Sequence, residues 1–308
     1  MTVLSPSSVI GQIRQLTSTI ANLLALFLSL ILLCLFIYKF FRFNTFQRKK
    51  FSSETSIFLA INTLILLVTR SILQFFEVDL NTIKRDYFPP QEFHDSFSCR
   101  FRAYILLSVH STLYWSYVLK SIFRFTRVIY PAYVRLHQVT TYVYIFIPIH
   151  YLIGFLTTLP IWAGFNAIYL LPNEPYCTAS YNELASLIYM PIVAFVLPLS
   201  IISICYMCIV VQIRRTAAVS SVNQSRNRRD FVVIRRIIMI IAILSMVSLP
   251  LFIDLFVFLP KGYIDPNMNS IGWLSSSINA VILTLSLPFI DPKMYRLISK
   301  TDVVHTCT

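Results

Sequence analysis

The chain of 308 residues is far more apolar than a soluble protein, with 56% hydrophobic residues, 13% charged residues and a mean hydropathy of +0.70. This composition excludes an ordinary soluble enzyme or soluble binding domain, and it indicates a protein that uses lipid as part of its solvent. The formal net charge of +13 does not indicate a nucleic-acid partner, because the basic residues alternate with apolar blocks and do not form one basic domain.

Apolar stretches long enough to cross a bilayer, about 20 residues each, recur along the whole chain. The predicted spans are 19–41, 55–76, 98–130, 139–163, 185–213, 231–259 and 271–295, and a short amphipathic helix is expected over 296–303. The predicted fold class is therefore an all-α membrane protein, a seven-helix transmembrane bundle that forms a single domain over residues 1–308.

The basic residues around the first span predict its orientation. Only Arg14 precedes the span, whereas a group of basic residues lies at its end and beyond it: Lys39, Arg42, Arg48, Lys49 and Lys50. Basic residues favour the cytoplasmic side, so the amino terminus is expected outside. Residues 1–17 contain no visible signal peptide, and the first helix is expected to act as its own insertion signal.

The stretch 99–131 reads as one long helix with a different feature at each end. The rise from Cys99 to Arg124 is roughly 37 Å, slightly more than the ~30 Å hydrocarbon core, so these two residues should lie at opposite membrane surfaces. Of the six cysteines, only Cys99 and Cys177 are expected on the oxidising outer side, which predicts a disulfide between them. Arg124 stands between Phe123 and Phe125, where a charge partner is valuable.

Ionisable and polar residues inside the spans are candidates for a ligand pocket in the outer half of the bundle. Arg70 and Asp254 are the strongest, because a charge inside the membrane is costly and usually functional. Together with His110 and Asn279 they could line the pocket. Two other readings of Arg70 stay open, in which it snorkels to the interface or pairs with Glu77. His110 could equally be a satisfied core residue.

The inner end of the third predicted span carries a familiar pattern. Arg124, Phe125, Val128 and Pro131 stand in the order Arg, aromatic, two residues, Val, two residues, Pro. Rhodopsin-like G-protein-coupled receptors have Asp-Arg-Tyr followed by this spacing at the same place. Taken alone, this match is weak.

Two further segments make the match specific. Pro198 and Tyr206 lie in the fifth span, and Asp291, Pro292 and Tyr295 close the seventh in the order Asp-Pro-x-x-Tyr. The chain thus resembles a divergent member of the rhodopsin-like receptor family over nearly its whole length.

The resemblance implies a plasma-membrane receptor that passes an extracellular ligand signal to a heterotrimeric G protein, with no cofactor. The sixth helix would move outward at Pro250, and Pro198 would permit a kink in the fifth. In the resting state Arg124 would contact Asp230; on opening, Tyr206 and Tyr295 would swing toward Arg124. The residues expected to contact the G protein are Arg127, Val128, Pro131 and Arg235.

Departures from the family pattern restrict the expected ligand and ion sites. Phe123 replaces the acid that usually restrains the arginine, which suggests elevated basal signalling. The second span lacks an acid between Glu54 and Glu77, so no bound sodium ion is expected. Leu106 stands where amine receptors carry an Asp, which makes a biogenic amine an unlikely ligand. The acidic outer loops would suit a cationic peptide, or they are simply a solvated face.

Other classes of function remain open from the sequence. Arg70 and Asp254 could be path residues of a seven-helix transporter or channel, although no inverted repeat or selectivity filter is visible. A receptor-like protein that does not couple is a further alternative. An enzyme is not expected, because no nucleophile–base constellation or metal motif is present.

Overall fold

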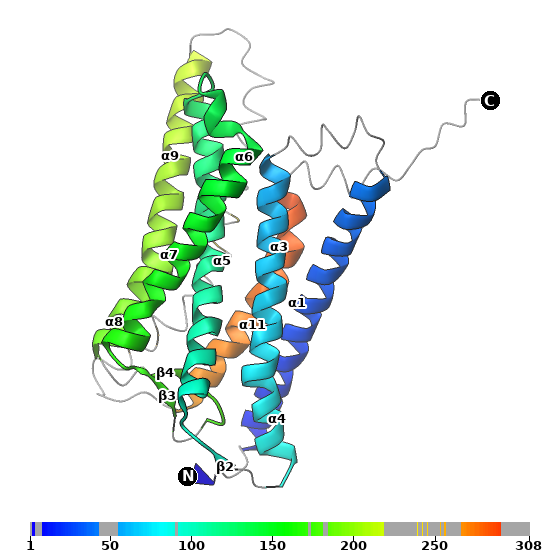
Figure 1. The fold of residues 1–308 in the computed structure, drawn as a ribbon, viewed down its shortest axis with the longest axis vertical. Coiled ribbons are helices and arrows are strands. Elements are labelled where there is room, and N and C mark those ends of the chain that lie inside the picture. The colour runs from blue at the N-terminus through cyan, green and yellow to red at the C-terminus, as the bar shows by residue number, and fades with distance from the viewer. Residues whose placement is uncertain are drawn as a thin grey trace, which may run out of the picture.

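The computed structural model describes residues 2–3, 8–42, 55–89, 92–171, 174–180, 184–218 and 266–290, with single positions 239, 242, 245, 253 and 256. Most of this chain is helical, and the long helices stand side by side (Figure 1). The α-helices in the described residues, long and short, are α1 (Val9–Arg42), α3 (Thr55–Gln74), α4 (Leu80–Tyr87), α5 (Phe97–Ile129), α6 (Val139–Thr141), α7 (Ile147–Leu159), α8 (Leu184–Pro191), α9 (Leu197–Ala218) and α11 (Pro266–Ile290).

Within the described ranges, five helical stretches are long and apolar enough to cross a membrane. They are Val9–Lys39, Thr55–Tyr87, Val139–Gly164, Leu184–Gln212 and Asn269–Phe289. These stretches confirm the prediction of a helical membrane protein. The predicted sixth span, apart from the single positions above, the end of the seventh and the helix over 296–303 lie outside the described residues.

The second span is longer than predicted. Its helix does not stop near Phe76 but continues through a π-helical turn, Phe75–Asp79, into α4, which ends at Tyr87. The acidic residues after Phe76 suggested a loop, yet Asp79 and Thr82 both lie on the buried side of the helix with 0% exposure. The helix therefore continues, with a buried face, through the polar residues that follow Phe76. The first helix is also longer than predicted and begins at Val9.

Helix α5 occupies the centre of the bundle and packs against α3, α7 and α9. It is not among the five apolar stretches because residues such as Ser108, Ser111 and Ser116 dilute its apolar sequence. All three serines are at most 2% exposed. They share hydrogen bonds with Thr158, Thr157 and Thr63 of neighbouring helices at 2.6, 3.1 and 3.2 Å. Such bonds hold membrane helices together where the hydrophobic effect gives little drive.

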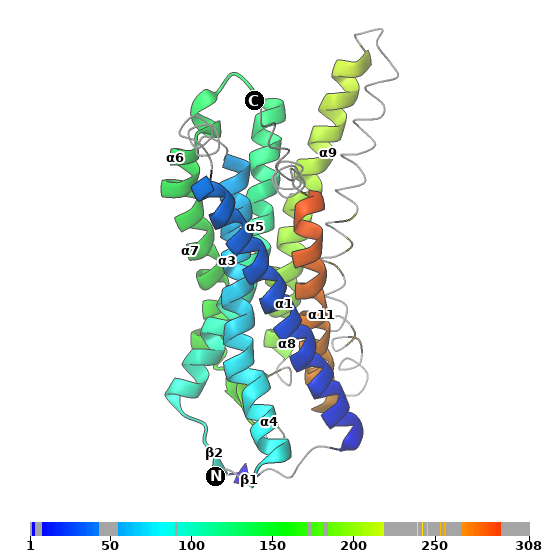
Figure 2. The ribbon, with the colours of Figure 1, turned by 90° about the vertical axis from the view of Figure 1, so that its right-hand side faces the viewer.

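The remaining helices pack around this centre. Figure 2 shows α1 running obliquely across α3 and α11, and it packs against both. Three of the π-helical turns in the described residues lie beside prolines: Tyr142–Phe146 before Pro148, Pro160–Gly164, and Ile192–Val196 between Pro191 and Pro198. A proline lacks the N–H that the preceding turn needs, so the helix locally widens. The predicted kink at Pro198 thus lies directly after an irregular turn.

Short strands cover the end of the bundle at which the amino terminus lies (Figure 1). The pair β1 (Thr2–Val3) and β2 (Glu92–Phe93) is antiparallel, and so is the pair β3 (Ile168–Leu170) and β4 (Cys177–Ala179). In the second pair Ile168 faces Ala179 and Leu170 faces Cys177. A disulfide joins Cys177 to Cys99 of α5, with the two Cα atoms 5.6 Å apart. The predicted disulfide is confirmed, and it ties β4 to the outer end of the central helix.

Candidate functional site

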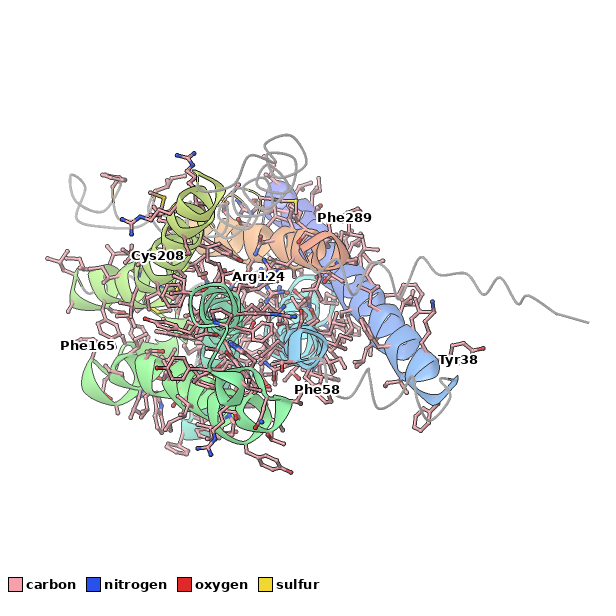
Figure 3. The ribbon with its side chains drawn as sticks, turned by 90° about the horizontal axis from the view of Figure 1, so that it is seen from above. Tyr38, Phe58, Arg124, Phe165, Cys208 and Phe289 are labelled. Atoms are coloured by element: carbon pink, nitrogen blue, oxygen red, sulfur yellow. A yellow bond between two sulfur atoms is a disulfide. The ribbon has the colours of Figure 1, made fainter. Side chains whose placement is uncertain are left out.

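At the end of the bundle opposite the disulfide, Arg124 makes a hydrogen bond between two helices. Its Nη1 donates to the hydroxyl of Tyr206 on α9 over 2.9 Å. Tyr206 is 3% exposed, and Arg124 lies near the middle of the helix ends in the view from above (Figure 3). The family resemblance places this contact in the open arrangement, and the structure contains it. Asp230 and Tyr295, the other predicted partners, lie outside the described residues.

Phe123 fills an apolar site beside Arg124. It is 6% exposed and packs edge-to-face against Tyr142, with the ring centroids 5.3 Å apart. The guanidinium of Arg127 lies 6.0 Å from the Phe123 ring centroid. An acidic side chain at this position would face an aromatic ring and would need a charged partner. Phe123 therefore lies in an apolar group with Leu59, Leu119 and Tyr142, and the guanidinium of Arg127 is beside its ring.

The predicted G-protein contacts lie on the surface at this same end. Arg127 and Pro131 are exposed, and Val128 is 37% exposed. These residues leave a basic and apolar surface beside Arg124. Arg235, Pro250, Asp291 and Pro292 fall outside the described residues.

In the outer half, Arg70 lies inside the protein with 1% of its surface exposed. Its Nη2 donates to Gln74 Oε1 and to Ser276 Oγ, both over 2.5 Å, and its Nε donates to His110 Nδ1 over 3.4 Å. Neither alternative reading of Arg70 is correct, since it does not reach the interface and Glu77 faces Arg102 at 3.5 Å.

Asp79 is a buried acidic residue in the π-helical turn that follows α3. Its Oδ2 accepts a hydrogen bond from Asn22 Nδ2 of α1 over 2.8 Å. One turn away, Gln15 of α1 donates to Thr82 over 2.9 Å. The available signal was spacing: Gln15, Ser18 and Asn22 recur three and four residues apart, which places polar groups on one face of a helix.

These polar groups lie between the same helices in three hydrogen-bonded sets, which together we call the outer polar cluster. It joins α1, the α3–α4 helix, α5 and α11 through side-chain hydrogen bonds. Its members are Gln15, Ser18, Asn22, Arg70, Gln74, Asp79, Thr82, His110, Ser276 and Ser277. Because unpaired polar groups are costly in the membrane interior, such a set is either a strong structural tie or a place where a ligand binds.

The other predicted pocket residues lie near this cluster or on the same helices. Leu106 is 3% exposed and packs with Val78, Tyr176 and the partly buried Trp273. Asn279 of α11 is 5% exposed. Asp254 lies outside the described residues. The structure thus brings Arg70 and His110 into contact and places Leu106 under the disulfide-held loop.

The loop before Cys177 is fixed to the surrounding helices by polar contacts. Glu174 is 6% exposed and lies 3.7 Å from Arg85 of α4, and Asn269 of α11 donates to the Tyr176 hydroxyl over 3.1 Å. Burial raises the pKa of the Glu174 carboxyl, and the charge of Arg85 opposes that rise. The loop therefore closes over the apolar group around Leu106.

A family model described as 7 transmembrane receptor (rhodopsin family) matches residues 86–295 of the chain. The match covers more than half of the sequence and includes the disulfide, the Arg124 pattern and the Asp-Pro-x-x-Tyr segment. No curated protein matches the chain.

Proposed function

Because the chain belongs to the rhodopsin family of seven-transmembrane receptors, we propose that it couples binding of an extracellular ligand to activation of a heterotrimeric G protein. In this proposal seven helices cross the plasma membrane and the sixth moves outward at Pro250. The switch residues are Arg124, Tyr206, Asp230, Asp291, Pro292 and Tyr295, with Arg127, Val128, Pro131 and Arg235 at the G-protein surface.

The observation that supports the proposal best is the hydrogen bond between Arg124 and Tyr206. It joins α5 and α9 at the end of the bundle where the cytoplasm is expected. A phenol can donate and accept, so Tyr206 can keep a hydrogen bond whether or not the guanidinium remains beside it. An agonist then needs only to bind better to the arrangement that admits the G protein.

The direct test is nucleotide exchange by the purified protein reconstituted in vesicles with a panel of heterotrimeric G proteins. We expect ligand-free GTP exchange above that of empty vesicles for at least one G protein, and loss of that exchange in Arg124→Gln. Tyr206→Phe removes one hydrogen bond and should reduce exchange about fivefold. The matched control is Tyr144→Phe, because Tyr144 is 78% exposed on the outside of the bundle. Exchange in Arg124→Gln equal to that of the unaltered protein would contradict the proposal.

Phe123→Asp should lower ligand-free signalling. The introduced carboxylate would lie next to Arg124 in sequence and compete with Tyr206 for the guanidinium, which favours the resting arrangement. The same exchange assay measures the effect, and Phe123→Leu controls for the loss of the aromatic contact with Tyr142. Equal ligand-free GTP exchange in the Asp variant and the unaltered protein would contradict this prediction.

A further inference from the structure

Arg70 is a buried cation whose hydrogen-bond partners are all neutral. It is 1% exposed, and it donates to an amide, a hydroxyl and an imidazole. Among the residues that the structure describes, its Nη1 has no hydrogen-bond partner and no carboxylate lies within ion-pair distance of its guanidinium. Buried charges in proteins are normally paired, so the environment of Arg70 is electrostatically incomplete.

The charge of Asp79 acts on Arg70 through space, but no ion pair joins the two side chains. His110 accepts from Arg70 through Nδ1 and is therefore neutral, with its proton on Nε2. Asp79, further along the same helix, is held by Asn22 of α1.

The side chains next to His110 on the side of the disulfide are apolar. Leu106 lies one helical turn outward of His110 on α5, since four residues rise about 6 Å. It packs with Val78 and Tyr176 and with the partly buried Trp273. An apolar group bound next to Arg70 would therefore lie against aromatic and aliphatic side chains. The molecule that complements Arg70 and these side chains has an apolar body and one anionic group.

We propose that Arg70 binds the carboxylate of an amphipathic carboxylic acid, whose apolar body lies against Leu106, Tyr176 and Trp273. The inference rests on the proposed receptor function, because it names the ligand class of that receptor. A carboxylate accepts charge-assisted hydrogen bonds from Nη1 and complements the guanidinium better than any neutral partner. The intrachain alternative is the carboxylate of Asp254 in the predicted sixth span, which lies outside the described residues.

The test measures binding to the purified protein in nanodiscs by ligand-induced thermal stabilisation, without a G protein. The probes are straight-chain monocarboxylates from acetate to stearate, with benzoate and phenylacetate, each compared with its primary amide. We expect at least one acid to bind ten or more times more tightly than its amide, by roughly the contribution of a charged hydrogen bond. Arg70→Gln should abolish this preference and Arg70→Lys should keep part of it. Arg102→Gln, which changes an exposed arginine paired with Glu77, should keep all of it.

The comparison of acid with amide on the unaltered protein remains informative even if Arg70→Gln fails to fold. The proposal is overturned if no acid is preferred over its amide, or if the preference persists in Arg70→Gln. It is also overturned if the unaltered protein binds no acid and Asp254→Asn destabilises it as much as Arg70→Gln, because Asp254 is then the partner. An acid that binds through Arg70 without stimulating GTP exchange supports this site while contradicting G-protein coupling.

Discussion

Cys99→Ser is expected to lower the free energy of unfolding by about 4 kcal/mol, because the disulfide closes a long loop and its loss frees the unfolded chain. The two cysteines are 78 residues apart in the sequence. The change also releases β4, so the contacts of Glu174 and Tyr176 with neighbouring helices should weaken. Thermal unfolding of the purified protein in detergent measures the effect.

The matched control for the disulfide is Cys34→Ser, since Cys34 is a free and exposed cysteine of α1. It should unfold at the temperature of the unaltered protein. Reduction of the unaltered protein should reproduce the effect of Cys99→Ser. A melting temperature for Cys99→Ser that matches Cys34→Ser would show that the disulfide contributes little to stability.

Gly154→Ala is expected to destabilise the protein by about 1–3 kcal/mol, the usual cost of overfilling a packed core. A Cβ at Gly154 of α7 would lie 2.8 Å from the Cα of Thr112 on α5. Because that atom is backbone, the two helices must move apart, and the bond between Ser108 and Thr158 at 2.6 Å must lengthen. Thermal unfolding compares the variant with the unaltered protein.

Gly272→Ala is the control for Gly154→Ala, because an added Cβ at Gly272 meets nothing within 4 Å. Both glycines lie in helices, so both changes carry the same gain of helix propensity, up to about 1 kcal/mol. Gly272→Ala should therefore be neutral or slightly stabilising. If Gly154→Ala behaves like Gly272→Ala, then α5 and α7 are not held as closely as the structure indicates.

Apolar length predicted the bounds of two helices closely. The predicted span 98–130 corresponds to Phe97–Ile129, and 139–163 corresponds to the stretch Val139–Gly164. It failed at the outer end of the second span, where Glu77 and Asp79 interrupt the apolar run although the helix continues to Tyr87. A hydropathy pattern cannot distinguish a charge in a loop from a charge buried against another helix.

A site residue could be predicted from the sequence where its side of the membrane was enough to identify its partner. Two cysteines on the outer side were enough to predict the disulfide. The partners of Arg70 were not predictable, because Gln74 and Ser276 are ordinary polar residues until α11 packs beside α3. Asp79 was missed for the same reason, since its partner Asn22 is 57 residues away in the sequence.

The hydroxyl pairs between α5 and α7 hold these two helices in one position relative to each other. Ser108 pairs with Thr158 and Ser111 pairs with Thr157 close to the contact of Gly154 with Thr112, so sliding of one helix along the other would break both pairs. Spectroscopic labels on α5 and α7 should therefore keep a constant separation when other helices of the bundle move. The distance between labels on α5 and α7 could then be compared with the distances from these labels to other helices, to detect movement of those helices.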